Sequence, residues 1–445
     1  QDTWGLWRKN VLNPESNVQF GEGGAGTFSD GKLYSQIKDP RHLGRKVLTE
    51  FVTFGAPPEI LYTAHPHIGT FKLVKLVEGI REEIVRLGGE VRFEQRVTDV
   101  QIEGEGEQRQ LTGLQVLNQV TGESYHLPTH HAVMALGHSA RDTFVNFYER
   151  GVAMEAKPFS IGFRIEHPQS VIDRARWGKD AGHPLLGAAD YKLVHHAKNG
   201  RAVYSFCMCP GGTVVAATSE PGRVVTNGMS QYSRAERNAN AGMVCAISPE
   251  DYPQDAESFS WAFDGKTLGV EKLQKGEHHP LSGVVLQRQL ESKAYELGGQ
   301  NYSAPGQLVG DFVAGTPSSE FGAVQPSYKP GIHLGDLHQA LPAYAIEAMR
   351  EALPAFGKKI RGYDMNDAVL TGVETRTSSP VKIGRGADFQ SDNTRGLYPA
   401  GEGASYAGGI LSAGVDGIKV GEAVACAILN LPVPSSGSRG SGGAL

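Results

Sequence analysis

Residues 396–414 read GLYPAGEGASYAGGILSAG and carry the strongest structural signal in the chain. The pattern predicts a short strand at residues 397–400, then a glycine-rich turn, then a helix from about residue 410 to 429. Apolar residues recur near helical spacing between positions 415 and 428, so one face of this helix can pack on a sheet. A strand, a turn and a helix in this order are typical of an α/β fold.

The turn before this helix is suited to binding an anion or an electron-rich oxygen. The backbone N–H groups of Gly408, Gly409 and Ile410 are expected at the helix N-terminus, where they lack partners within the helix. Gly401 and Glu402 follow the strand end, where open α/β sheets bind ligands, and the carboxylate can accept hydrogen bonds from ligand hydroxyls. The alternative is an ordinary strand–turn–helix without a ligand.

Composition limits the class of protein. The chain has 445 residues, enough for two or three domains, and its formal net charge of −5 without a strongly basic run argues against a nucleic-acid partner. No apolar run reaches the ~18 residues that a membrane helix needs, and four cysteines suit a reducing compartment. We therefore expect a cytoplasmic protein without membrane attachment and with a small-molecule substrate. No histidine or cysteine motif predicts a metal site, and the oligomeric state stays open.

A second glycine-rich loop lies in residues 17–34, NVQFGEGGAGTFSDGKLY. It matches the bare pattern G-x-G-x-x-G. However, the residues before it are half polar and those after it favour a turn, so the dinucleotide-binding fingerprint is not met. The many amides of such a loop can form an anion-binding nest, with a mobile surface loop as the alternative. The residues that we assign to cofactor contact are Gly21, Glu22, Gly23, Gly24, Ala25 and Gly26.

The segment from residue 70 to 150 changes from helix to strands. Helical periodicity runs from Thr70, a candidate N-cap, to about residue 87. Val91 and Phe93 alternate as a strand, and extended runs follow near residues 98–103 and 111–118. Residues 131–136 then predict a buried strand that ends in glycine.

The segment from 151 to 367 differs from its neighbours in its pattern of apolar and polar residues. Strand-like runs at residues 159–165, 202–207 and 213–217 alternate with long polar connections, which predicts an inserted, mostly antiparallel β substrate or cap domain. A helical run at 341–356, broken by Pro354, leads back to the first domain. The expected division is therefore residues 1–150 with 368–432, residues 151–367, and a disordered tail at 433–445.

Two stretches offer reactive side chains. Residues 370–380 supply a carboxylate, a guanidinium and several hydroxyls, and Arg376 and Ser378 are the candidate catalytic residues, with a capped turn held by a surface salt bridge as the alternative. Cys207 and Cys209 could form a redox pair, but a disulfide between neighbours on one face of a strand is strained, so a buried structural strand is favoured. His138 and the serine after it faintly resemble a nucleophile elbow without its second glycine, which disfavours a hydrolase.

Long runs of the chain resemble the bacterial uncharacterised FAD-dependent dehydrogenases, which are glutathione-reductase-like FAD/NAD(P)-binding flavoproteins. These runs are LNPESNVQFGEGGAGTFSDGKL (12–33), PHIG (66–69), GHSARD (137–142), CMCPGG (207–212), NGMS (227–230), ETRTSSP (374–380) and GEG (401–403). The resemblance implies that Glu402 holds the ribityl chain of FAD and that the helix at 410 faces the pyrophosphate and the flavin ring. It also implies FAD contacts at Gly137 and Val97.

The resemblance implies an FAD-dependent oxidoreductase, a dehydrogenase whose small-molecule substrate is unknown. Family members begin with a strand, glycine loop and helix that hold the ADP half of FAD, and this chain lacks that unit. We therefore expect a Rossmann domain that is incomplete at its N-terminus and that binds FAD weakly. NAD(P)H would act as a transient co-substrate, because no second dinucleotide fingerprint is present. The alternative is a flavin-free remnant that acts by binding a partner.

Overall fold

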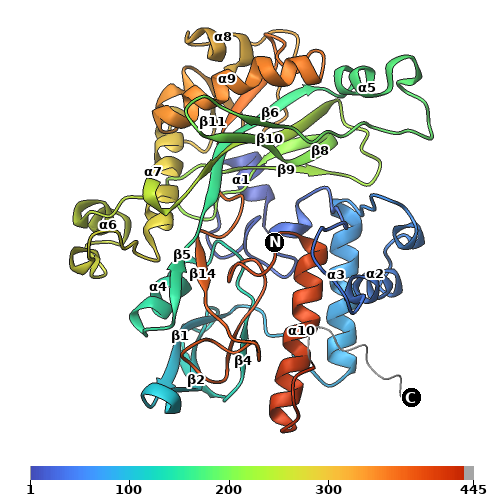
Figure 1. The fold of residues 1–445 in the computed structure, drawn as a ribbon. Helices are drawn as coiled ribbons and strands as arrows, with labels where there is room; N and C mark the ends of the chain where they lie inside the picture. Colours follow the sequence, from blue (N-terminus) through green and yellow to red (C-terminus); the bar gives the residue numbers. More distant parts are fainter. Residues whose placement is uncertain (1, 435–445) are drawn as a thin grey trace.

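The computed structural model describes residues 2–434, and its largest element is an eight-stranded sheet (Figure 1). The strand order is β12-β11-β13-β6-β10-β8-β7, and β9 pairs with β8. Every pairing is antiparallel except that of β11 with β12. The strands are β6 (Phe159–Pro168), β7 (Val194–His196), β8 (Ala202–Ala216), β9 (Thr226–Ser230), β10 (Asn238–Ile247), β11 (Ala304–Leu308), β12 (Ile332–Leu334) and β13 (Val369–Glu374).

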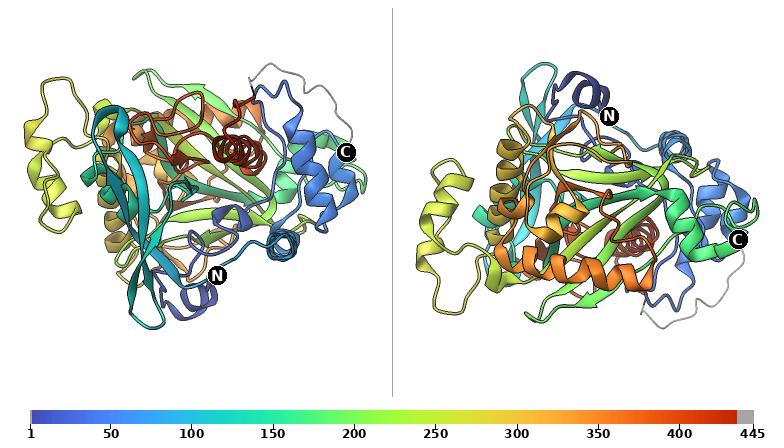
Figure 2. Two further views of the ribbon diagram at one scale, coloured as in Figure 1. Left: turned by 90° about the horizontal axis from the view of Figure 1, so that it is seen from below. Right: turned by 90° about the horizontal axis from the view of Figure 1, so that it is seen from above.

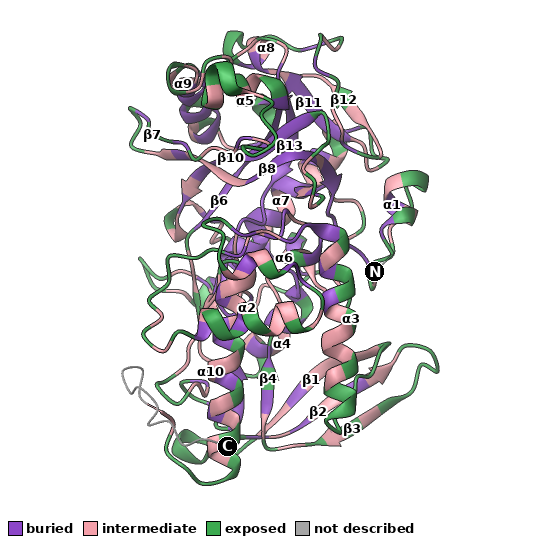
Figure 3. Cartoon of the chain, turned by 90° about the vertical axis from the view of Figure 1, so that its right-hand side faces the viewer, coloured by how far each residue is buried: buried purple, intermediate pink, exposed green. Residues whose placement is uncertain are grey.

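The centre of this sheet is formed by β6 and β10, which pair over their full ten residues. Ile161, Phe163 and Ile165 of β6 are fully buried, so the strand is covered on its apolar face. Helix α9 (Ala343–Lys359) lies across β10, β8 and β7, and α7 (Ser282–Leu297) lies against β11 and β13 (Figure 2). Figure 3 shows the buried residues concentrated around this sheet, which therefore holds the main hydrophobic core.

Two predictions for this region are wrong in detail. The runs at 202–207 and 213–217 form the single strand β8, because the glycines and proline between them are accommodated by irregular pairing with β10. The helix near 341–356 is not broken at Pro354, since α9 continues to Lys359. Leu353 and Phe356 on either side of the proline are fully buried, and this packing outweighs the ~3 kcal/mol that an interior proline costs.

The second part of the molecule contains a three-stranded antiparallel meander after a long helix. Helix α3 (Thr70–Arg86) precedes β1 (Gln95–Glu103), β2 (Gln110–Asn118) and β3 (Ser124–Pro128), which confirms the predicted helix and both extended runs. The strand expected at Val91 and Phe93 is absent from the described chain, because both side chains are exposed and lack a cross-strand partner. Thr70 does not cap the helix, since its hydroxyl donates to the Ser29 carbonyl at 3.0 Å and Gly69 is the N-cap.

The stretch at 396–414 folds as predicted. It forms β15 (Leu397–Pro399), a turn and helix α10 (Ile410–Ile428), and β15 pairs in parallel with β4 (Ala132–Met134). Val420 and Ala423 of α10 pack with the end of β15. The opposite side of the helix packs on α2 (Leu43–Thr53), and Figure 1 shows α2 and α3 beside α10 in the half of the molecule away from the large sheet.

The chain is thus a mixed α/β protein with predominantly antiparallel sheets. The expected domain boundary after residue 367 falls one residue before β13, a strand in the middle of the large sheet. No helix within residues 2–434 is long and apolar enough to cross a membrane. Residues 435–445 of the expected disordered tail lie outside the described residues.

The remaining elements are a two-stranded sheet and short helices. A small sheet pairs β5 (Met154–Ala156) with β14 (Val381–Ile383). The other helices are α1 (Trp4–Lys9), α4 (Arg141–Glu149), α5 (Gln169–Trp177), α6 (Ala256–Ala262) and α8 (Val309–Ala314). The 3-10 turns are η1 (Ala25–Thr27), η2 (Pro58–Leu61), η3 (Gly106–Gln108), η4 (Gly178–Asp180), η5 (Pro249–Asp251), η6 (Val270–Lys272) and η7 (Leu337–Gln339).

Candidate functional site

A cavity of about 330 Å³ opens at the N-terminus of α10. Two segments line it, residues 34–37 with Lys32, and residues 408–412. Gly408 and Gly409 are exposed, and a Cβ at either position would meet nothing within 4 Å. The amides of Gly409 and Ile410 begin the helix, so the ammonium of Lys32 and these N–H groups give the cavity a positive potential.

The amide of Gly408 differs from the prediction. It donates a hydrogen bond to the Ser412 hydroxyl at 3.1 Å, and that hydroxyl in turn donates to the Gly409 carbonyl at 2.9 Å. The Gly408 N–H is therefore engaged within the turn and is not free for a ligand. Because glycine has no side chain, Gly408 instead leaves room for a ligand to reach the backbone at the cavity.

The glycine loop at 21–26 lies next to this helix start. A Cβ at Gly26 would lie 3.4 Å from Cγ1 of Ile410, so two stretches almost 400 positions apart in the sequence are neighbours. The Thr27 hydroxyl donates to the Gly23 carbonyl at 2.8 Å and holds the loop closed. Glu22 points elsewhere, because its carboxylate forms an ion pair with Arg81 of α3 at 2.7 Å. The loop thus places its backbone beside the start of α10, while its one charged side chain, Glu22, is paired with Arg81.

The turns that follow β4 and β15 meet at the carboxyl ends of these two parallel strands. A Cβ at Gly403 would overlap the carbonyl oxygen of Gly137, so the two turns are in backbone contact. Gly137 and Gly401 have φ values of +68° and +70°, which favour glycine. The Gly401 N–H donates to Oδ2 of Asp416 in α10 at 2.8 Å, which fixes the turn to the helix. Gly137, Gly401 and Glu402 therefore lie close together at this edge of the sheet.

Glu402 lies partly buried in this turn, and its side chain has no hydrogen-bond partner within residues 2–434. Desolvation raises the pKa of this carboxyl to about 7, although the Lys157 ammonium opposes the change. Burial also lowers the pKa of Lys157. A carboxyl group that titrates near neutral pH and lacks a partner is available to accept from, or to donate to, a bound molecule.

Arg376 lies beside these turns but is fully engaged. Its Nε and Nη2 donate to Glu291 at 3.0 and 2.9 Å, and its Nη1 donates to the hydroxyls of Ser139 and Ser219 at 3.0 and 2.7 Å. The expected alternative of a surface salt bridge is wrong, because Arg376 and Glu291 are both buried. Arg376 therefore positions the 137–139 turn through Ser139, and Ser378 is its partly exposed neighbour two residues on.

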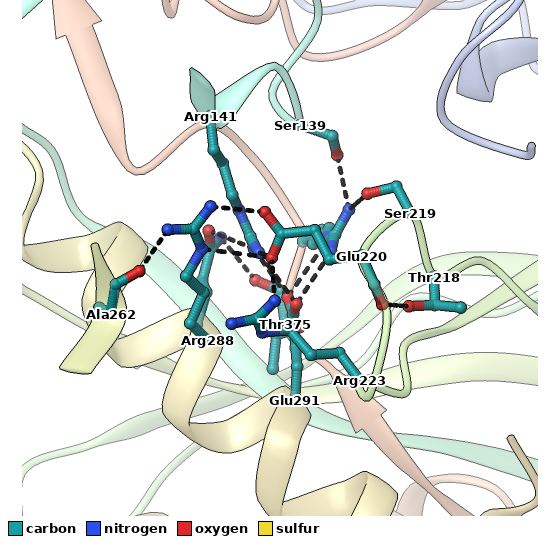
Figure 4. Close-up of polar contacts among 12 residues, drawn as sticks. Ser139, Arg141, Thr218, Ser219, Glu220, Arg223, Ala262, Arg288, Glu291 and Thr375 are labelled. Atoms are coloured by element: carbon teal, nitrogen blue, oxygen red, sulfur yellow. Dashed lines mark hydrogen bonds and ion pairs between the residues drawn. The ribbon is translucent and has the colours of Figure 1, made fainter. Parts of the chain in front are cut away.

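Arg376 belongs, through Glu291, to a largely buried cluster of charged side chains, which we call the arginine cluster. Figure 4 labels its other three arginines and both glutamates. Glu291 and Glu220 each pair with Arg141, at 2.8 Å in both cases, and Glu220 also pairs with two further arginines. Burial alone would raise the pKa of Glu291, but the neighbouring guanidinium groups overcome this and lower it to about 2. The members of the arginine cluster are Arg141, Arg223, Arg288, Arg376, Glu220 and Glu291.

Four guanidinium groups face two carboxylates in this cluster, which leaves two positive charges in surplus. His138, beside it, remains neutral, because desolvation and the charges of Arg376 and Arg141 lower its pKa to about 3. Ser139 is buried and its hydroxyl accepts from Arg376, so it is not placed as an exposed nucleophile.

Three further residues of this site were not predicted. Lys32 and Lys157 supply charge, and Asp416, paired with Arg385 at 2.5 Å, holds the 401 turn. No local sequence pattern marks them, because their partners are distant in the chain. Val97 lies in β1 opposite Val116, in the three-stranded meander, and does not line the cavity. No group of three or more His, Cys, Asp or Glu in the described chain is suited to a metal ion.

Comparison with known proteins gives two informative matches. Residues 158–377 match the family model described as FAD-dependent protein, C-terminal domain-like. A protein of Clostridium beijerinckii (strain ATCC 51743 / NCIMB 8052), named only as an uncharacterized protein, is 48% identical over 419 residues, which are 94% of this chain and 72% of that protein.

Solved structures give weaker matches. CtdE in complex with FAD has a TM-score of 0.25 and 11% identity, over 79% of this chain and 59% of that chain. The anhydrotetracycline hydroxylase OxyS from Streptomyces rimosus has a TM-score of 0.21 and 15% identity, over 51% and 38%. This chain spans less than two thirds of either structure, and TM-scores this low carry no argument about the site.

Proposed function

This chain belongs to the FAD-dependent family that includes the uncharacterised Clostridium protein, and we propose that it is an FAD-dependent oxidoreductase acting on a small molecule. FAD is the cofactor supported by the matched family. Within that class we propose a dehydrogenase, with NADH or NADPH as a transient electron donor. The observation that carries the proposal is the backbone contact between the turns at Gly137 and Gly403, next to the unpartnered Glu402. The 401–410 segment then leads to the start of α10, which lines the cavity.

The residues present fit a flavin in two respects. The turns at Gly137 and Gly401 have positive φ values, and a Cβ at either would meet nothing within 4 Å, so both leave room for close approach to a bound molecule. The unpartnered carboxyl of Glu402 suits the ribityl hydroxyls, which are its expected ligand. FAD would supply two-electron redox chemistry when bound.

The electrostatics of the cavity favour a group that becomes negative on reduction. The amides of Gly409 and Ile410 and the Lys32 ammonium are fixed in place before any ligand arrives, so they stabilise new negative charge with little reorganisation. The surplus positive charge of the arginine cluster, whose Arg376 contacts Ser139, would also stabilise a negative charge on the ligand. In this proposal Arg376 is a positioning residue. Ser378, which is partly exposed, is the residue of the 374–380 segment that would contact a substrate.

The test is a binding titration of the purified chain with FAD, followed by flavin fluorescence. We expect saturable quenching for the wild-type chain and about ten- to hundredfold weaker binding for Glu402→Ala, because a hydrogen bond to a charged group contributes about 1.5–3 kcal/mol. The control is Glu123→Ala, an exposed glutamate of the β2–β3 turn, which should bind as the wild type does. Reduction by NADH or NADPH under anaerobic conditions is then followed near 450 nm.

Two results would contradict the proposal. Equal FAD binding by wild type and Glu402→Ala would remove the 401–403 turn from the flavin site. Absence of any flavin binding, together with capture of a specific protein partner, would instead favour the flavin-free remnant.

A further inference from the structure

Strand β8 bends at the cysteine pair. Phe206 lies opposite Gly242 and Cys209 opposite Asn240 of β10, so the two residues Cys207 and Met208 face a single residue of the partner strand. This is the arrangement of a β-bulge. Cys207 accordingly has a φ of +42°, in the left-handed region. A disulfide between residues two positions apart is expected to be strained in a regular strand. The segment around Cys207 is not a regular strand, so that expectation does not apply to it.

Within the bulge, the Cys209 sulfur is turned toward Cys207. The Cys209 thiol donates to the Cys207 carbonyl at 3.4 Å, so its sulfur points back along the strand. Cys209 is fully buried, whereas Cys207 is partly exposed. An accessible sulfur beside a buried one is the arrangement of an attacking and a resolving thiol.

Two cations hold the backbone of the bulge. Arg164 donates to the Cys207 carbonyl at 2.8 Å, and Lys32 donates to the Met208 carbonyl at 2.5 Å. The hydrogen bond from Cys209, aided by the charges of Arg164 and Lys32, lowers the pKa of Cys207 to about 6, against the opposing effects of burial and of Glu374. The pKa of Cys209 is raised, with the hydrogen bond to Cys207 as the largest cause, ahead of burial and of the Asp30 charge.

The pair adjoins the candidate flavin site. Lys32, which anchors the bulge, also lines the cavity at the start of α10. The Cys207 thiolate is one of the charges that raise the pKa of Glu402. The bulge, Lys32 and Glu402 therefore form one electrostatic neighbourhood.

We propose that Cys207 and Cys209 are a redox-active dithiol that exchanges two electrons with the flavin, an inference that rests on the proposed function. In the oxidising direction the Cys207 thiolate and the Cys209 thiol form one S–S bond. The Cys209 S–H bond breaks, and the pair releases two electrons and that proton, for which bound oxidised FAD would be the acceptor. The reverse step restores the thiolate and the thiol.

The first test needs no flavin. The reduced chain is treated with iodoacetamide at pH 7 and the modified cysteines are identified by mass spectrometry. Cys207 should react roughly tenfold faster than Cys426, which is also partly exposed, because a larger fraction of it is thiolate. The rate at Cys207 should reach half its maximum near pH 6. A rate no faster than that of Cys426 overturns the proposal.

The second test follows the disulfide itself. The chain is equilibrated with mixtures of reduced and oxidised dithiothreitol, and formation of a 207–209 disulfide at a defined potential is expected, and is lost in Cys209→Ser. Absence of the disulfide in every mixture overturns the proposal.

The third test joins the pair to the cofactor. Excess FAD is added to the reduced chain without oxygen, and both loss of absorbance near 450 nm and the 207–209 disulfide should appear in the wild type but not in Cys207→Ser. If FAD binds and neither appears, the dithiol proposal fails while the proposed function stands. If FAD does not bind, the proposed function fails and the link to the flavin fails with it.

Discussion

The two halves of the molecule differ in how their buried charged groups are partnered. Around the large sheet, the buried arginines are paired with carboxylates, as in Arg164–Glu374 at 2.7 Å and Arg376–Glu291 at 2.9 Å. Around β4, β15 and α10, the turns leave a carboxyl at Glu402 and the first amides of α10 without partners in the described chain. A ligand that bonds the Glu402 carboxyl would supply the contact that the described chain leaves unmade. We therefore propose that the first half is scaffold and that the second half holds the ligand.

The largest effect is expected in the arginine cluster. Glu291→Gln removes the carboxylate that neutralises Arg141 and Arg376, and it leaves both guanidinium groups buried and underpaired. We expect the free energy of unfolding to fall by about 3–5 kcal/mol, measured by urea denaturation. Glu123→Gln, at an exposed turn, should change it by less than about 0.5 kcal/mol. A loss as small as that of the control would show that the cluster does not support the scaffold.

The next effect tests the contact between the two glycine turns. Gly403→Ala places a methyl group against the backbone oxygen of Gly137, which cannot yield as a flexible side chain would. The turns must separate, at a cost of about 1–3 kcal/mol, and FAD binding should weaken in parallel. Thermal unfolding and flavin quenching measure both quantities. Unchanged values would mean that the turns are not in close contact.

A pH effect comes third. The folded-state pKa of Glu402 is raised to about 7, so between about pH 4.5 and 7 the folded chain binds more protons than the unfolded chain, and stability falls as pH rises. Glu402→Gln lacks this titration, so its stability relative to the wild type should increase across that window. We expect about 1–2 kcal/mol, since one pKa unit is about 1.4 kcal/mol and the carboxyl is only partly buried. A constant difference from pH 4 to 8 would contradict the burial of this group.

The smallest effect has the opposite sign and uses another glycine of the same region. Gly417 lies inside α10, is exposed, and would place a Cβ in open space. Gly417→Ala should therefore stabilise the chain by about 0.5–1 kcal/mol, because alanine loses less backbone entropy in a helix. FAD binding should not change. Differential scanning calorimetry provides the measurement, and a destabilised variant would show that this face of α10 is covered.

The sequence predicted the elements that carry local patterns. The strand at 397–400, the helix at 410–429 and the strands at 98–103 and 111–118 are all present, because glycine punctuation and apolar periodicity act over a few residues. The predicted break at Pro354 fails for the converse reason, since packing from distant elements holds α9 continuous.

The glycines of the candidate site were picked out from the sequence, but the partners of its charged groups were not. Gly137 contacts the 401–403 turn and Gly26 contacts Ile410, while their role in binding FAD stays a prediction. The pairing of Arg376 with Glu291 was missed, because the two residues are 85 positions apart. A glutamate in a helix such as α7 is ordinarily expected to be exposed to solvent. The bulge at Cys207 was missed, because it arises from the register in which β8 pairs with β10. Long-range partners therefore decide which polar groups remain free for a ligand.

Hydrogen–deuterium exchange with and without excess FAD tests the central claim most directly, because it locates the cofactor on the backbone. The account predicts slower exchange in residues 21–26, 137–139 and 401–412, and unchanged exchange in the β1–β3 meander. Protection confined to the meander or to the face of the large sheet covered by α9 would contradict the assignment of the flavin to the start of α10.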